Sequence, residues 1–140
     1  MLPWTWAAER LTQSRGYWLA TAWPDGRPHM AVVWGIWLHD HFYFFTGATS
    51  RKARNLAANP RCVVCPEQTD EAVIVEGVAE VVTDPTVLRT FVEAYAAKYQ
   101  EEVDTATFIT YGVRPVMAFG AISEAVDWPG SATRWRFRAA

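Results

Sequence analysis

Apolar and polar side chains alternate over many short segments of this chain, a pattern that predicts β-strands. Turn-forming residues separate these segments. The clearest turn is Pro24-Asp25-Gly26, in which proline fixes φ and glycine tolerates a positive φ. Strands joined by such turns form hairpins, so we expect an antiparallel sheet. The predicted strands span residues 17–23, 28–38, 42–46, 62–67, 72–82, about 114–126 and 133–138.

Three other segments carry apolar residues at the three- and four-residue spacing of a helix. The first spans residues 2–13. In the second, residues 51–58, Ser50 stands at the N-cap position and Asn59-Pro60 ends the helix. The longest begins at Asp84-Pro85, where an acidic cap precedes a proline at the first helical position. Its apolar face consists of Leu88, Phe91, Val92, Tyr95 and Tyr99. Six or seven strands with these helices predict a mainly β (α+β) fold, an antiparallel split β-barrel with flanking helices.

The segment from Pro28 to Leu38 is apolar on both of its faces. On a strand, Met30, Val32, Trp34 and Ile36 face one side, and Ala31, Val33 and Trp37 face the other. A strand of this kind meets bulk water on neither face, so both sides must be covered. In a chain this small the simplest cover is a second copy of the chain, and we therefore expect a symmetric homodimer.

Length and composition indicate one globular domain, residues 1–140. The 140 residues, 51% of them hydrophobic and 20% charged, suffice for one core. A formal net charge of −2 argues against nucleic-acid binding. No apolar run reaches the roughly 18–20 residues of a transmembrane helix, so no membrane association is expected. Only Cys62 and Cys65 are present and no leader precedes the first segment, which predicts a cytoplasmic protein.

The segment from Thr46 to Arg54 is the most informative candidate site. A predicted strand ends at Thr46, Gly47 follows, and a helix capped by Ser50 begins at once. Free backbone N–H groups and the positive end of the helix dipole would meet Arg51 and Lys52 there, which favours a bound phosphate. The chain has only two lysines, and Lys52 is one of them. The alternative is an exposed amphipathic helix whose first turn is basic.

A second candidate lies near the C-terminus, where aromatic and basic residues alternate. On a strand, Arg134, Arg136 and Arg138 share one face, and Trp135 and Phe137 share the other. One interpretation is a closing strand with an arginine-lined edge. Beside a phosphate site, the same pair of residue types can clamp a flat, anionic cofactor.

The remaining reactive side chains predict no metal or redox site. Cys62 and Cys65 have the spacing of a redox motif, but residues three apart on a strand face opposite sides. His29, His39 and His41 stand near turns without the ligands that would complete a zinc site. We expect no metal.

The chain resembles the pyridoxamine 5′-phosphate oxidase-like superfamily, most closely its small flavin- and deazaflavin-dependent oxidoreductases of the split β-barrel type. The likeness rests on Tyr17-Trp18-Leu19-Ala20-Thr21, Pro24-Asp25-Gly26-Arg27-Pro28-His29, Val33-Trp34, and Tyr43-Phe44 leading into Thr46-Gly47 and Ser50-Arg51-Lys52-Ala53-Arg54-Asn55-Leu56. It implies a homodimer that holds FMN or the deazaflavin coenzyme F-420 in grooves between the two protomers.

The resemblance also assigns roles to individual residues. Val32, Val33 and Trp34 would border the ring system of the cofactor, with Phe45 and Thr46 at its underside. Ser50, Arg51 and Lys52 would hold its phosphate, and Arg134 and Trp135 would reach across from the partner protomer. True pyridoxamine-phosphate oxidases carry a C-terminal arginine-and-histidine motif, whereas this sequence has no histidine beyond His41. We therefore do not predict oxidation of vitamin B6.

These observations predict an oxidoreductase that transfers hydride between a bound flavin or deazaflavin and an unsaturated, largely planar small molecule. No catalytic residue is identified; Tyr17, Tyr43 and Tyr111 are either proton donors or core tyrosines. One alternative is a non-catalytic protein that binds or stores flavin, haem or another tetrapyrrole with the same fold. Another is a nucleic-acid-binding barrel, against which the acidic charge balance argues.

Overall fold

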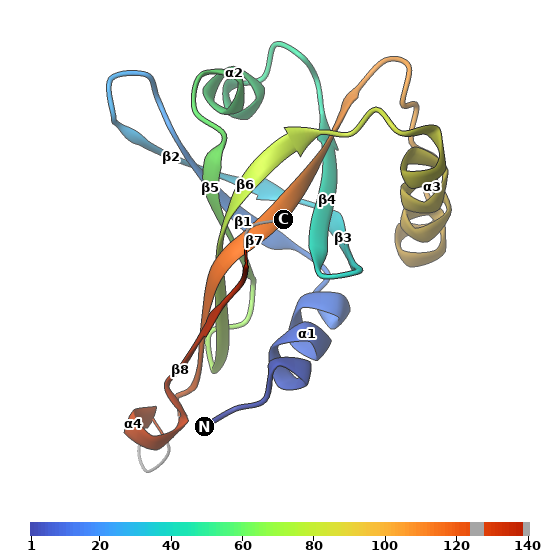
Figure 1. Cartoon of the computed structure of the whole chain (residues 1–140). Helices are drawn as coiled ribbons and strands as arrows, with labels where there is room; N and C mark the ends of the chain where they lie inside the picture. Colours follow the sequence, from blue (N-terminus) through green and yellow to red (C-terminus); the bar gives the residue numbers. More distant parts are fainter. Residues whose placement is uncertain (124–127, 139–140) are drawn as a thin grey trace.

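The structure, a computed structural model, describes residues 1–123 and 128–138, and it confirms the mainly β fold (Figure 1). One antiparallel sheet curls into a half-barrel, and helices flank it. The helices are α1 (Trp4–Gln13), α2 (Arg51–Ala58), α3 (Pro85–Tyr99) and the short α4 (Trp128–Ser131). The strands are β1 (Tyr17–Ala22), β2 (Pro28–Val33), β3 (Gly35–Leu38), β4 (His41–Thr46), β5 (Arg61–Pro66), β6 (Glu71–Val81), β7 (Ile109–Ile122) and β8 (Thr133–Arg136).

The order of strands in the sheet is β2-β1-β5-β6-β7-β4-β3, and β8 pairs with β7. The long strand β7 organises this arrangement. β6 pairs with β7 along one edge, while β4 and then β8 pair with successive parts of its other edge. In Figure 1, β6 and β7 run side by side through the middle of the molecule.

A single residue, Trp34, joins β2 and β3, although these strands stand at opposite ends of the order. The sheet must therefore curl until its first and last strands meet at Trp34. The predicted strand over 28–38 was wrong in this respect, because it is divided in two here. A Cβ at Gly35 would lie only 2.4 Å from Cζ of Phe42 and 2.5 Å from the carbonyl oxygen of Tyr43, so the close approach of β3 and β4 requires glycine.

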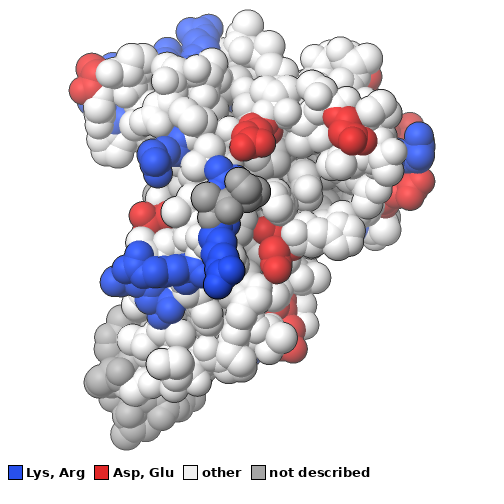
Figure 2. Space-filling model, viewed as in Figure 1, with Lys and Arg blue, Asp and Glu red and all other residues white. Residues whose placement is uncertain are grey.

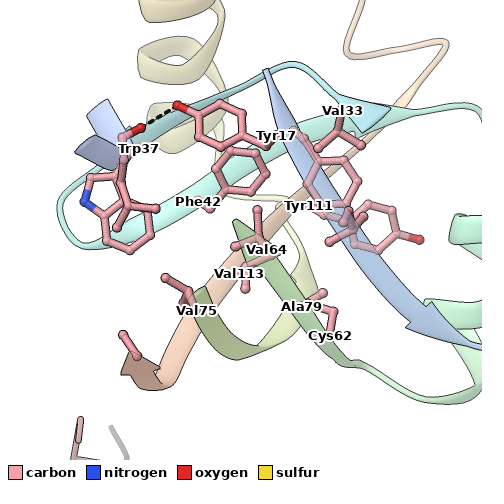
Figure 3. Close-up of a cluster of buried hydrophobic side chains, with 14 of the residues drawn as sticks. Tyr17, Val33, Trp37, Phe42, Cys62, Val64, Val75, Ala79, Tyr111 and Val113 are labelled. Atoms are coloured by element: carbon pink, nitrogen blue, oxygen red, sulfur yellow. Dashed lines mark hydrogen bonds between the residues drawn. The ribbon is translucent and has the colours of Figure 1, made fainter. Parts of the chain in front are cut away.

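The core fills the inside of the curled sheet. Tyr17, Phe42, Phe44, Val64 and Val113 are all almost completely buried, and Figure 3 shows several of these side chains converging from different strands. The rings of Tyr17 and Phe42 lie 4.6 Å apart between centroids. This packing explains the alternating pattern of the sequence, because every second residue of β1 and β4 points inward.

A second apolar cluster lies between α3 and the outside of β3 and β4. Its buried members are Ile36, Phe91, Tyr95, Tyr99 and Val103, and Figure 1 shows α3 beside these strands. Helix α3 therefore covers the outer face of β3, where we had expected a second copy of the chain. The outer side chains of β2 are not covered in this way, since Met30 is 60% exposed. The homodimer stays a prediction.

The local signals at helix ends are confirmed. The Ser50 hydroxyl accepts a hydrogen bond of 3.1 Å from the Ala53 N–H, and Asp84 accepts one of 2.8 Å from the Thr86 N–H. Helix α1 begins at Trp4 instead of Leu2, and β7 begins at Ile109 instead of near Arg114. Positions 124–126 of the strand predicted at about 114–126 lie outside the described residues. Within the described part of the chain, no helix is long and apolar enough to cross a membrane.

Candidate functional site

A hollow of about 270 Å³ lies where the end of β2, the end of β4, α2 and α3 come together. From β2 and its end it is lined by Val32, Val33 and Trp34. Phe45 of β4 and Lys52 of α2 form further parts of its wall. The structure thus brings together these five residues of the predicted site from three elements of the fold.

The ring-binding part of the predicted site is apolar and contains an exposed indole. Val33 is buried, whereas Val32 is 42% and Trp34 52% exposed. Among the described residues, Trp34 makes no ring contact with another aromatic side chain. Phe45 is held in place by an edge-to-face contact with Tyr95, with ring centroids 5.3 Å apart. Such walls suit a flat, conjugated ligand.

Hydrogen bonds between Thr46 and Ser50 connect this wall to the helix that carries Lys52. The Thr46 hydroxyl donates to the Ser50 hydroxyl oxygen at 2.9 Å, and the Ser50 oxygen also accepts from the Ala53 N–H. These contacts fix the start of α2 against the end of β4, so Lys52 reaches the hollow. The N-terminal N–H groups of α2 and the Lys52 amine together favour an anion at this end.

Arg51, which was predicted to hold phosphate, does not line the hollow. Its guanidinium carbon lies 3.6 Å from the centre of the Trp23 ring, and its Nη1 lies 3.4 Å from Oδ1 of Asn55. Arg27 lies over the same ring at 4.1 Å. Arg51 is therefore directed towards the hairpin between β1 and β2.

Arg134 and Trp135 lie on β8, on a part of the sheet that does not line the hollow. Trp135 is half-buried and contacts Trp4 edge-to-face at 5.3 Å. A Cβ at Gly120 would lie 2.7 Å from the Trp135 ring, so glycine is needed for this approach. Arg134 is exposed, and Figure 2 shows basic side chains gathered near β7 and β8 and again near α2. The role of both residues in a partner's groove stays a prediction.

The sequence analysis missed Tyr95 and Glu101, which complete the wall of the hollow. The ring of Tyr95 is buried, and no hydrogen-bond partner of its hydroxyl is found among the described residues. Burial raises the pKa of Tyr95, and the nearby Glu101 carboxylate raises it further, so the phenol keeps its proton at neutral pH. The helical spacing of Tyr95 identified it as a core residue only, and Glu101 follows α3 without any motif.

A second hollow of about 220 Å³ adjoins the first. The two share Trp34, Tyr95 and Glu101, and the second is also lined by Arg15 and Tyr99. Trp34 therefore borders both spaces. Lys52, Phe45 and the two valines line only the first, and Arg15 and Tyr99 line only the second.

Comparison with known proteins shows which family the chain belongs to. Residues 6–122 match the family described as pyridoxamine 5′-phosphate oxidase. The chain belongs to this family. The resemblance noted in the sequence is thereby confirmed, and the split-barrel fold of the family agrees with the curled sheet. A search of curated proteins gave no significant match by sequence.

Several solved structures share this fold. A conserved hypothetical protein, Rv2991 from Mycobacterium tuberculosis, is 25% identical over 84% of this chain and 83% of its own, with a TM-score of 0.73. An F420 reductase is 26% identical over 79% of this chain and 93% of its own, with a TM-score of 0.64. The haem storage protein HutZ from Vibrio cholerae, at 16% identity over 78% of this chain and 87% of its own and a TM-score of 0.67, shares the fold alone.

Within this family member, the tyrosines and cysteines singled out by sequence lie outside the hollow. Tyr17 is buried in the core and donates a hydrogen bond to the carbonyl oxygen of Leu11. Tyr43 and Tyr111 do not line the hollow either. Cys62 is buried, and burial raises the pKa of its thiol to about 12. It is therefore no reactive thiolate at neutral pH.

Proposed function

We propose that this family member is a flavin- or deazaflavin-dependent oxidoreductase that holds FMN or the deazaflavin coenzyme F-420 in the hollow beside Trp34. It transfers hydride between this cofactor and an unsaturated, largely planar small molecule. One observation carries the proposal: Val32, Val33, Trp34, Phe45 and Lys52, which the resemblance assigns to ring and phosphate, line one hollow. They do so from three elements of the fold, since Val32 and Val33 belong to β2, Phe45 to β4 and Lys52 to α2.

The side chains around this hollow fit a flat group with an anionic tail. Trp34 offers an exposed indole face for a ring, and Phe45 and Val33 keep water from one side of it. Lys52 supplies a cation at the end of the hollow formed by α2. When bound, a flavin or deazaflavin supplies the hydride chemistry, and the protein supplies orientation and electrostatics.

Tyr95 is the side chain best suited to hold a proton at this site. Its hydroxyl has no hydrogen-bond partner among the described residues, and its ring is fixed between Phe45 and Tyr99. Because burial and Glu101 keep the phenol protonated, Tyr95 can donate a proton to a substrate that has accepted hydride. This role replaces the open choice among Tyr17, Tyr43 and Tyr111.

The comparisons support the same class of activity. The F420 reductase that resembles this chain is 26% identical to it, and the family match spans residues 6–122. HutZ is a haem storage protein, but at 16% identity its likeness concerns the fold and carries no argument for storage here.

We further propose a homodimer formed through the outer face of β1, β2, β5 and β6. Trp18 and Val32 are paired across β1 and β2, and each is 42% exposed. Cys65 is paired with Trp18 on the other side, and Ile74 of β6, 39% exposed, continues the apolar band. A contiguous apolar surface of this kind is typical of a subunit interface. As the resemblance implies, Arg134 and Trp135 of one protomer would then reach the hollow of the other.

Titration of the purified protein with FMN and with F-420, followed by absorbance and fluorescence, tests the proposed site. Saturable binding of either cofactor that is weakened in Trp34→Ala supports it. The matched control is Trp23→Ala, because Trp23 is an indole in contact with arginines outside the hollow. Equal affinities in the parent and Trp34→Ala contradict the assignment.

A further inference from the structure

The last residues of α3 bind the backbone at the junction of β2 and β3. The Tyr99 hydroxyl accepts a hydrogen bond from the Gly35 N–H at 3.1 Å and lies 3.0 Å from the Gly35 carbonyl oxygen. It also lies 2.8 Å from the carbonyl oxygen of Arg15, directly before β1. β3 is the last strand in the order, so no further strand pairs with its outer edge. The Tyr99 hydroxyl instead contacts the N–H and the carbonyl oxygen of Gly35 there.

Lys98 reinforces the same junction. Its amine donates to the Gly35 carbonyl oxygen at 3.1 Å and to the Tyr17 hydroxyl oxygen at 2.9 Å. A longer contact of 3.5 Å reaches the carbonyl oxygen of Thr12 at the end of α1. One side chain of α3 is therefore joined to α1, β1 and β3, and its donors are all directed at protein atoms.

Trp34 depends on this junction for its position. It directly precedes Gly35, lies in neither β2 nor β3, and is 52% exposed. Because Trp34 stacks on no aromatic ring among the described residues, its indole is placed mainly by the backbone that carries it. The same indole borders both hollows.

We propose that Lys98 and Tyr99 are positioning residues, which fix Gly35 and thereby hold Trp34 where it borders both hollows. Lys98 lines neither hollow, and Tyr99 lines only the second. The Lys98 amine and the Tyr99 hydroxyl therefore act on a bound cofactor through Trp34, whereas the Tyr99 ring also packs against Tyr95, with centroids 4.6 Å apart, and is kept in Tyr99→Phe. This effect on binding rests on the proposed function, whereas the placement of Trp34 does not.

The charges at the junction make this positioning depend on pH. Burial and the positive charge of Arg15 lower the pKa of Lys98 to about 8. The other groups that face it keep their protons in this range, because burial raises the pKa of Tyr99 to about 12 and raises that of Tyr17 as well, with Glu67 adding to both. As pH rises through about 8, Lys98 loses its charge and one of its three donors. The hold on Gly35 then weakens.

Fluorine NMR of protein labelled with 5-fluorotryptophan measures the surroundings of Trp34 directly. The resonance missing from Trp34→Phe identifies this residue among the eight tryptophans. The test variants are Tyr99→Phe, which keeps the ring, and Lys98→Met, which keeps most of the aliphatic chain. The matched controls are Tyr43→Phe, since the Tyr43 hydroxyl has no described hydrogen-bond partner, and Arg89→Met, an exposed cation on the same helix.

We expect the Trp34 resonance to shift in both test variants and in neither control. In the parent it should move with a midpoint near pH 8, and this step should be absent in Lys98→Met. Binding of FMN or F-420 should weaken by about three- to tenfold in both test variants, as for the loss of one or two hydrogen bonds. A Trp34 resonance that coincides with the parent's in both folded variants overturns the proposal, even if the cofactor binds.

Two further results keep the test decisive. If the parent binds neither cofactor, the proposed function fails, and the fluorine spectra still decide whether Lys98 and Tyr99 position Trp34. If one test variant does not fold, the other decides: a Trp34 resonance shifted from the parent's supports the proposal, and a resonance that coincides with the parent's overturns it.

Discussion

The guanidinium carbon of Arg51 lies 3.6 Å from the centre of the Trp23 ring, although the resemblance assigns this side chain to the cofactor phosphate. The guanidinium carbon of Arg27 lies 4.1 Å from the centre of the same ring, so two cations contact one indole. Lys52, the next residue of α2, lines the hollow instead. Of these two cations at the start of α2, Lys52 is the one whose removal should affect an anionic ligand most.

Lys52→Ala is expected to weaken the binding of FMN or F-420 by about tenfold or more, because a charge-assisted contact is worth roughly 1.5–3 kcal/mol. Titration at constant salt measures the change. Arg54→Ala is the matched control, since Arg54 is an exposed cation of the same helix. If the two variants have the same affinity as the parent, Lys52 does not hold the phosphate.

Trp135→Ala should lower the free energy of unfolding by about 3 kcal/mol, because the indole packs over Gly120 and against Trp4. Thermal melts with and without cofactor separate this packing role from a role in a partner's groove. A smaller cofactor-induced rise in melting temperature than in the parent indicates that Trp135 also clamps the cofactor. A cofactor-induced rise equal to the parent's indicates that Trp135 has a packing role only. A melting temperature without cofactor that equals the parent's contradicts the packing role.

Stability should rise with pH above about 8 because of Lys98. Its folded pKa of about 8 lies below the ordinary value of 10.5, so between these values the unfolded chain binds more protons than the folded chain. The free energy of unfolding therefore increases with pH in this window, by a modest amount since Lys98 is only half-buried. Urea unfolding at pH 7.5 and 9.5 measures it. An equal increase in Lys98→Met shows that another group is responsible.

The opposite trend should appear at still higher pH. Tyr17 and Tyr99 have raised pKa values in the folded state, so the unfolded chain loses phenol protons first and stability falls above about pH 10. The Lys98 measurement is therefore confined to pH values below this range.

The protein should sediment as a dimer at micromolar concentration, with an interface that buries more than about 2,000 Å². Trp18→Glu places a charge in the middle of the proposed apolar face and should yield a monomer. Val81→Asp is the control, because Val81 is 55% exposed at the end of β6 and lies outside the apolar band. A parent that sediments as a monomer contradicts the interface.

Local signals in the sequence predicted most of the elements of the fold. The caps at Ser50 and Asp84 and the turn before Arg27 depend on residues close in sequence, and the structure contains all of them. The division of the predicted strand at Trp34 was missed because apolar residues continue through this position on both faces of the strand. Only the meeting of the two ends of the sheet, a long-range property, divides this segment.

The site was predicted less completely, because it too depends on contacts between residues far apart in the sequence. Val33, Phe45 and Lys52 belong to motifs of the resemblance, and they do line one hollow. Tyr95 and Glu101 join them only because α3 packs across β3 and β4. Nor does any local pattern show that Arg51 turns towards Trp23, which belongs to another hairpin.

The most direct test of the central claim is a steady-state oxidation assay with reduced F-420 or reduced FMN and a panel of planar, unsaturated acceptors, quinones among them. The account predicts sustained oxidation of many equivalents of cofactor per protein. The rate of oxidation should be lower in Tyr95→Phe, and at low cofactor concentration the rate in Lys52→Ala should fall towards that of the uncatalysed reaction. A protein that shows the spectrum of bound cofactor but oxidises no more than one equivalent with any acceptor would contradict an enzymatic role and indicate a storage or binding protein.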